Sequence, residues 1–171
     1  MLQQKFYHGI IRKSIIAFGN LFNNITIDRL NSSNEVEQSI RVPLSYAPKQ
    51  KFLARIAAQP QSFEQSFQTF LPRLAFEMTG ITYDPARRIS LVQQNRALNS
   101  TNNTLNSQYA PTPYNINMVL YCYSKNQDDG LQIIEQILPY FNPDFNLNLK
   151  TVPALNIVND LPIILDSINY E

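Results

Sequence analysis

The N-terminal segment places apolar side chains on one face of a predicted helix. These side chains recur at intervals of three or four residues: Tyr7, Ile11, Ile15, Phe18 and Phe22. Such spacing is typical of an amphipathic α-helix that packs one face against a core. The pattern predicts a first helix that ends near residue 23, with Gly19 weakening its last turns.

A second helical face lies in the C-terminal half of the chain. It comprises Leu131, Ile134, Ile137, Leu138 and Phe141. Asp128 and Asp129 stand where they can cap the start of this helix and favour its positive end. Two prolines that follow in the sequence terminate it.

Apolar and polar side chains alternate in the segments outside these helices, as they do in half-buried β-strands. Residues 25–28 and 36–44 flank a polar turn and predict a β-hairpin. Residues 71–78 and 145–149 predict two further strands, and we expect one more extended segment near the C-terminus. Residues 116–122 carry apolar side chains on both faces, so we expect this strand to be central in the sheet.

The stretch from Ser39 to Arg55 joins the hairpin to a basic helix. Pro43 interrupts the backbone donors of the strand, and Pro48 closes a turn before a helix expected over residues 48–58. Three cations decorate the outside of this helix: Lys49, Lys51 and Arg55. From its pattern alone, this corner is a candidate catalytic site, nucleic-acid patch or assembly surface.

The chain is expected to fold as a single domain, residues 1–171, because its length and its 44% of apolar residues suit one packed core. Residues from about 90 to 113 are rich in Asn, Gln, Ser and Thr and predict a long polar loop. The predicted fold class is α+β. A mostly antiparallel β-sheet is expected to pack against the N-terminal helix and a second amphipathic helix.

The net charge argues against a bulk attraction to phosphate or to an anionic membrane. Fourteen basic and thirteen acidic residues leave a formal charge of +1. Charged residues interrupt the apolar N-terminus, so neither a signal peptide nor a membrane span is predicted. Outside the corner, positive charge gathers only at Arg87 and Arg88, which follow an Asp-Pro turn.

The residue inventory argues against an enzyme and against a resident cofactor. His8 and Cys122 are the only histidine and cysteine, too few for a metal set or a supported nucleophile, and Cys122 lies in an apolar run that predicts a buried, inert thiol. Four glycines cannot build a phosphate-binding loop. A weaker alternative is a hydrolase that uses the carboxylates of Asp84, Asp128 and Asp129.

The two basic groups leave three interpretations open: a solvated surface, a protein contact or a nucleic-acid contact. Their members are Lys49, Lys51, Arg55, Arg87 and Arg88. Nucleic-acid binding would call for a broader patch with exposed aromatic side chains. Arginine also suits protein interfaces because its guanidinium presents a rigid fork of donors.

Four sequence blocks occur in an order that resembles a known family. They are FYHGIIRKSIIAFGNLFNNI, IRVPLSYAPKQKFLARI, LPRLAFEMTGITYDPARR and DDGLQIIEQILPYFNPDFNLNL. Together they resemble the proximal tail sheath stabilisers, or tail terminators, of contractile-tailed bacteriophages. The similarity spans nearly the whole chain, and none of the blocks is a catalytic signature.

The resemblance implies a structural virion protein at the junction of tail and neck, assembled in the host cytoplasm. It implies a tail-terminator-like α+β subunit in a homohexameric ring that caps the tail tube and stabilises the sheath. The implied partners are other copies of the chain, the tail tube and sheath proteins, and neck or head-completion proteins. Genomic DNA would pass through the central channel, and the five basic residues are candidates for the assembly interface.

Two points stay open at this stage. In the family, strand-forming sequence continues beyond the position that matches Tyr170 and Glu171, so this chain is either a short member or lacks a C-terminal part. The alternative function is a DNA-binding accessory protein or another neck or head-completion protein. A DNA-binding role would use the same basic residues.

Overall fold

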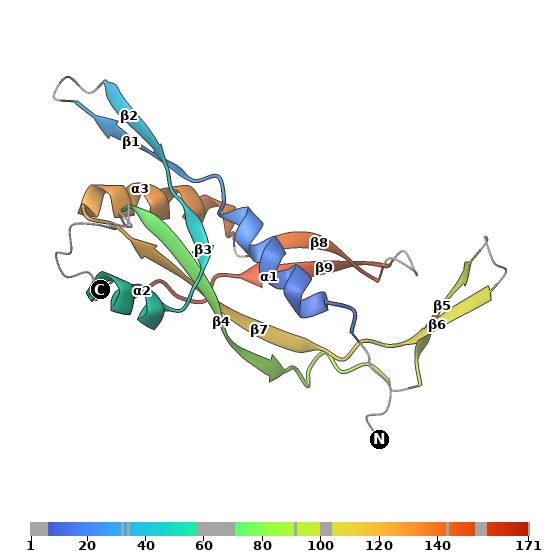
Figure 1. Cartoon of the computed structure of the whole chain (residues 1–171). Helices are drawn as coiled ribbons and strands as arrows, with labels where there is room; N and C mark the ends of the chain where they lie inside the picture. Colours follow the sequence, from blue (N-terminus) through green and yellow to red (C-terminus); the bar gives the residue numbers. More distant parts are fainter. Residues whose placement is uncertain are drawn as a thin grey trace.

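The computed structural model (Figure 1) describes residues 7–31, 33, 35–57, 71–90, 92–99, 104–142, 144–152 and 157–170. The described helices are α1 (Ile10–Leu21), α2 (Lys49–Ala57), α3 (Gln127–Ile137) and the short 3-10 helix η1 (Leu138–Tyr140). The described strands are β1 (Thr26–Leu30), β2 (Val36–Arg41), β3 (Leu44–Tyr46), β4 (Arg73–Tyr83), β5 (Gln94–Asn99), β6 (Thr104–Tyr109), β7 (Tyr114–Tyr123), β8 (Asp144–Val152) and β9 (Ile157–Ile164). None of the helices within these ranges is long and apolar enough to cross a membrane.

The strands form one three-stranded sheet and three antiparallel hairpins. In the sheet the order is β3-β4-β7, with β3 parallel and β7 antiparallel to β4. The hairpins are β1–β2, β5–β6 and β8–β9. This arrangement confirms the predicted α+β class with mostly antiparallel pairing, and it confirms strands near residues 25–41, 71–78 and 145–149 and an extended segment near the C-terminus.

The strand over residues 116–122 is not central, so that prediction was wrong. Among the described strands β7 lies at an edge and β4 lies in the middle. The two apolar faces of β7 have separate causes: Leu120 packs against the core, whereas Tyr123 on the other face stacks on Phe52 at a ring-centroid distance of 4.1 Å. Apolar side chains on both faces of a strand indicate that both faces are covered. They do not indicate whether the strand is central or at an edge of the sheet.

The hydrophobic core lies where α1, β1, β4 and α3 meet. Ile27, Leu74 and Ile133 are fully buried, and Val42 and Phe22 pack in the same cluster. Each fully buried side chain of this size contributes about 1.5–3 kcal/mol relative to an exposed one. Three segments distant in the sequence are therefore held together by a small apolar contact.

The predicted helical faces were only partly right. In α3 the buried apolar residue is Ile133, whereas Leu131 is 43% exposed, and Leu138, which lies in η1, is 39% exposed. In the N-terminal segment Tyr7 and Ile11 are 69% and 46% exposed. These helices present only part of each apolar stripe to the core, because the neighbouring β-elements cover a short length of each helix.

Polar contacts join α3 to β1. Arg29 donates a hydrogen bond and forms an ion pair to the buried carboxylate of Asp129 at 2.8 Å, and this partner raises the pKa of Arg29. The Gln132 amide accepts from the backbone N–H of Asp28 and donates to its carbonyl, both at 3.1 Å. Gln132 thus satisfies the Asp28 backbone as a neighbouring strand would.

The predicted polar loop at about 90–113 is largely a hairpin, so that prediction was wrong. β5 and β6 pair in register from Gln94 opposite Tyr109 to Asn99 opposite Thr104. Figure 1 shows this hairpin extending away from the three-stranded sheet. Its strands lack an alternating apolar pattern because no described core covers a face of it, and backbone pairing alone leaves no such signal in the sequence.

Gly19 allows α1 to lie against β4. A Cβ at this position would lie 2.8 Å from Cζ and 3.1 Å from Cε1 of the Phe76 ring, which is itself buried. Distances this short require one of the two elements to move. Gly19 is therefore a packing requirement at the centre of the fold.

We expect Gly19→Ala to lower the free energy of unfolding by about 1–3 kcal/mol, because the added methyl overpacks the contact with Phe76. In a Phe76→Leu background, the same change is expected to raise it by up to about 1 kcal/mol, the intrinsic helical advantage of Ala over Gly. Urea unfolding of the four proteins in this cycle measures the difference. If Gly19→Ala changed the free energy of unfolding equally in both backgrounds, the proposed contact between position 19 and the Phe76 ring would be contradicted.

Candidate assembly surface

The corner between the first hairpin and α2 moves the chain from one sheet to another. Residues 36–44 are not one continuous strand as predicted: β2 ends at Arg41, and β3 begins at Leu44 in the three-stranded sheet. The buried side chain of Val42 and the missing donor of Pro43 separate the two strands. The corner is therefore a fixed link between the hairpin and the sheet.

Backbone hydrogen bonds fix the start of α2 against β4. The N–H of Ala47 donates to the carbonyl of Phe76 at 3.1 Å. The carbonyl of Pro48 accepts from Lys51 at 3.1 Å and from Phe52 at 3.3 Å. The predicted basic helix after Pro48 is confirmed, and its first turn is tied to the sheet.

The cations of α2 differ in exposure. The side chain of Lys49 is half-buried, and that of Lys51 is exposed. Arg55 lies in α2, and its side chain lies outside the described part of the structure. Of the described cations of α2, Lys51 therefore faces solvent and Lys49 does so only in part.

The second basic group lies in the turn after β4. Arg87 donates from Nε to the Asp84 carboxylate at 2.6 Å and also hydrogen-bonds Asn115. The hydrogen bond from Arg87 lowers the pKa of Asp84, although partial desolvation opposes the shift. Arg88 is exposed. Arg87 therefore stabilises the turn, whereas Arg88 presents its charge at the surface.

The structure does not bring the two basic groups together. The corner is tied to Phe76 in β4, and the turn begins at Asp84, eight residues further along the same chain direction. At about 3.3 Å per strand residue, the positions on the chain where they attach, Phe76 and Asp84, are roughly 25 Å apart. They are two local features rather than one basic surface.

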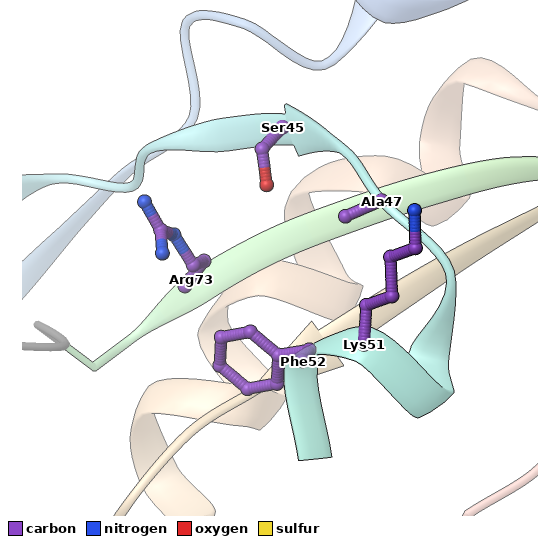
Figure 2. Close-up of a pocket in the computed structure, with 5 residues that line it drawn as sticks. All are labelled: Ser45, Ala47, Lys51, Phe52 and Arg73. Carbon is purple, nitrogen blue, oxygen red and sulfur yellow. The ribbon is translucent and has the colours of Figure 1, made fainter. Parts of the chain in front are cut away.

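Arg73, which we had not predicted as a site residue, completes a pocket at the corner. Ser45, Ala47, Lys51, Phe52 and Arg73 line a cavity of about 350 Å³ between β3, α2 and β4 (Figure 2). The Nε atom of Arg73 is buried and has no hydrogen-bond partner within the described residues. An arginine at the start of a strand gives no signal in the sequence, because only the fold places it beside Lys51.

Among the carboxylates of the hydrolase alternative, Asp84 lies apart from Asp128 and Asp129, which are adjacent in the first turn of α3. Asp84 follows the end of β4 that pairs with Tyr114, whereas Asp129 lies beyond the opposite end of β7 and pairs with Arg29. The described residues contain no group of three or more potential metal ligands. The positions of these acids favour structural roles, with Asp129 holding α3 to β1.

Cys122 is exposed on β7, so the prediction of a buried thiol was wrong. Strand alternation places Cys122 on the same face of β7 as Leu120, but the cover over that face does not bury this position. Desolvation by its surroundings still raises the pKa of the Cys122 thiol, which favours the protonated form. No base among the described residues is recorded in contact with this thiol.

The chain belongs to the family of T4-like virus Myoviridae tail sheath stabilisers, whose family model matches residues 5–171. Among curated proteins it is similar to the tail completion protein gp15 of Enterobacteria phage T4, with 32% identity over 148 residues. That alignment covers 84% of this chain and 53% of the relative, so the chain spans about half the length of that protein. The predicted resemblance to a tail structural protein of contractile-tailed phages is confirmed.

We expect Arg87→Gln to raise the pKa of Asp84 toward its ordinary value, because the hydrogen bond from Arg87 is the largest cause of the lowered pKa. A lowered carboxyl pKa stabilises the fold above the unfolded pKa, and this contribution is lost as the pH falls through the folded pKa. An NMR titration of the Asp84 carboxyl carbon measures the shift. The adjacent variant Arg88→Gln is the control, and equal pKa values in the two variants would contradict the assignment.

Proposed function

We propose that this chain forms a homohexameric ring that caps the tail tube and stabilises the contractile sheath at the neck of the virion. In this role residues 1–171 act as a single domain that contacts other copies of the chain, the tail tube protein and the tail sheath protein. Neck or head-completion proteins bind the opposite face, and genomic DNA passes through the central channel. The role is structural and requires no catalytic centre. Family membership over residues 5–171 supports the class of this function.

The observation that carries the proposal is a small exposed apolar cluster on the β5–β6 hairpin, on a face that also carries the polar side chains of Gln94, Arg96 and Ser107. Leu98 and Leu105 oppose each other in the register and are 68% and 60% exposed. Alternate residues of a strand share a face, so Tyr109, which is also exposed, lies on the same face as this pair. A two-stranded hairpin is marginally stable alone, and a neighbouring subunit would bury this face.

A ring suits such a hairpin. Head-to-tail contacts join two different surfaces of each subunit and close into a ring when the rotation closes. The hairpin extends from one end of the β4–β7 pair, and α2 lies near the other end (Figure 1). A subunit with contact regions at two ends can reach two different neighbours.

We propose that the basic residues of the corner and the turn belong to the assembly interface. Lys49, Lys51 and Arg55 on α2 and Arg88 in the turn would contact partners, while Arg87 holds the turn in place through Asp84. Their separation disfavours the DNA-binding alternative, because two small groups on a chain of charge +1 do not form a continuous basic track.

We expect Leu98→Asp to shift the protein from hexamer to smaller species, because the new carboxylate would be desolvated in the contact. Asn95→Asp is the matched control: Asn95 is exposed on the same strand, and the strand alternation places it on the opposite face. Mass measurement in solution and electron microscopy at moderate salt would compare both variants with the parent protein.

The parent protein is expected to form rings, and the Asn95→Asp protein should retain them. A parent protein that remains a monomer and binds neither tube nor sheath would contradict the ring. Equal assembly of both variants would contradict the assignment of this hairpin face. Tight duplex-DNA binding with a steep salt dependence would instead favour the DNA-binding alternative.

A further inference from the structure

The pocket between β3, α2 and β4 places two cationic side chains, Lys51 and Arg73, around one cavity. Within the described residues, neither Lys51 nor Arg73 forms a recorded ion pair. The buried Nε of Arg73 also has no hydrogen-bond partner there. That atom is shielded from solvent, so an anionic group in the pocket would meet the outer guanidinium nitrogens of Arg73 and the ammonium of Lys51.

The pocket walls are fixed by the fold. Ser45 lies in β3 opposite Ala75 of β4, and Ala47 is tied to Phe76 by its backbone N–H. Phe52 is 5% exposed and stacks on Tyr123. Figure 2 shows the Arg73 guanidinium and the Lys51 ammonium on two sides of the Ser45 hydroxyl, with the Phe52 ring along the wall. Donors and an apolar wall thus surround one small cavity.

We propose that this pocket binds the carboxylate of a Glu or Asp side chain presented by an assembling protein partner. The guanidinium of Arg73 and the ammonium of Lys51 donate to the carboxylate oxygens, Ser45 adds a hydroxyl donor, and Phe52 packs against the stem of the acidic side chain. That the partner is a protein rests on the proposed assembly role. That the bound group is a carboxylate rests on the donors that line the pocket.

A single acidic side chain suits this pocket better than a nucleic-acid backbone. The cavity is about 350 Å³, a volume in the range of small-ligand sites, and it holds two cations. Arg73 begins β4 and the second basic group follows the other end of this 11-residue strand, so successive phosphates would not meet a continuous row of cations. A partner side chain that enters the pocket requires no such row.

The test is an NMR titration of the full chain with the blocked peptide acetyl-Ala-Glu-Ala-Ala-amide, with the Gln peptide as its neutral control. We expect the Glu peptide to shift the Arg73 Nε–H signal and the Ser45 and Phe52 amide signals, and the Gln peptide to leave them in place. Arg73→Gln and Lys51→Met should each weaken binding about tenfold or more. Arg12→Gln, which removes an exposed charge from α1, should leave it unchanged.

Thermal melting of each variant would check that the pocket variants remain folded. Absence of peptide-dependent shifts in the folded parent protein would overturn the proposal. Equal shifts with the Gln peptide, or tighter binding of a DNA duplex through Arg73 and Lys51, would also overturn it. Because the titration uses no other tail protein, its failure can be distinguished from a failure of ring assembly.

Discussion

The burial of Ile27, Leu74 and Ile133 in one apolar cluster is the constraint on which the rest of this structure depends. They come from β1, β4 and α3, three elements that are distant in sequence. At about 1.5–3 kcal/mol for each buried side chain, their burial contributes an amount comparable with the net stability of a domain, about 5–15 kcal/mol. The first hairpin, the corner and the β4–β7 pair all take their positions from it.

Polar groups then divide into those that hold the fold and those that, by our proposal, contact partners. Asp129 pairs with Arg29, and Gln132 satisfies the backbone of Asp28, so these groups are used within the subunit. Lys51 and Arg73 have no recorded ion pair in the described part of the chain and line a cavity. A partner within the subunit therefore marks a polar group as structural, and the lack of a recorded ion pair marks a candidate assembly contact. Residue type alone does not separate the two, because arginine occurs in both.

Sequence periodicity predicted where helices and strands occur better than it predicted which of them lie side by side. The alternation around Ile27 and Leu74 correctly predicted strands, because alternate residues of a strand share a face. It could not order the strands, so β7 was wrongly expected to be central. The β5–β6 hairpin was missed because its exposed polar strands carry no alternating apolar pattern. Arg73 was missed because its relation to Lys51 arises only when β4 and α2 meet.

Family membership and the exposed hairpin face support an account in which this chain functions as a subunit between copies of itself and other tail proteins. Its most direct test is electron microscopy of the intact particle neck at a resolution that traces this chain. The account predicts a sixfold ring of the chain at the head-proximal end of the tail, in contact with the last rings of tube and sheath. Density for the chain at another position in the particle, or as an isolated subunit at the neck, would contradict it.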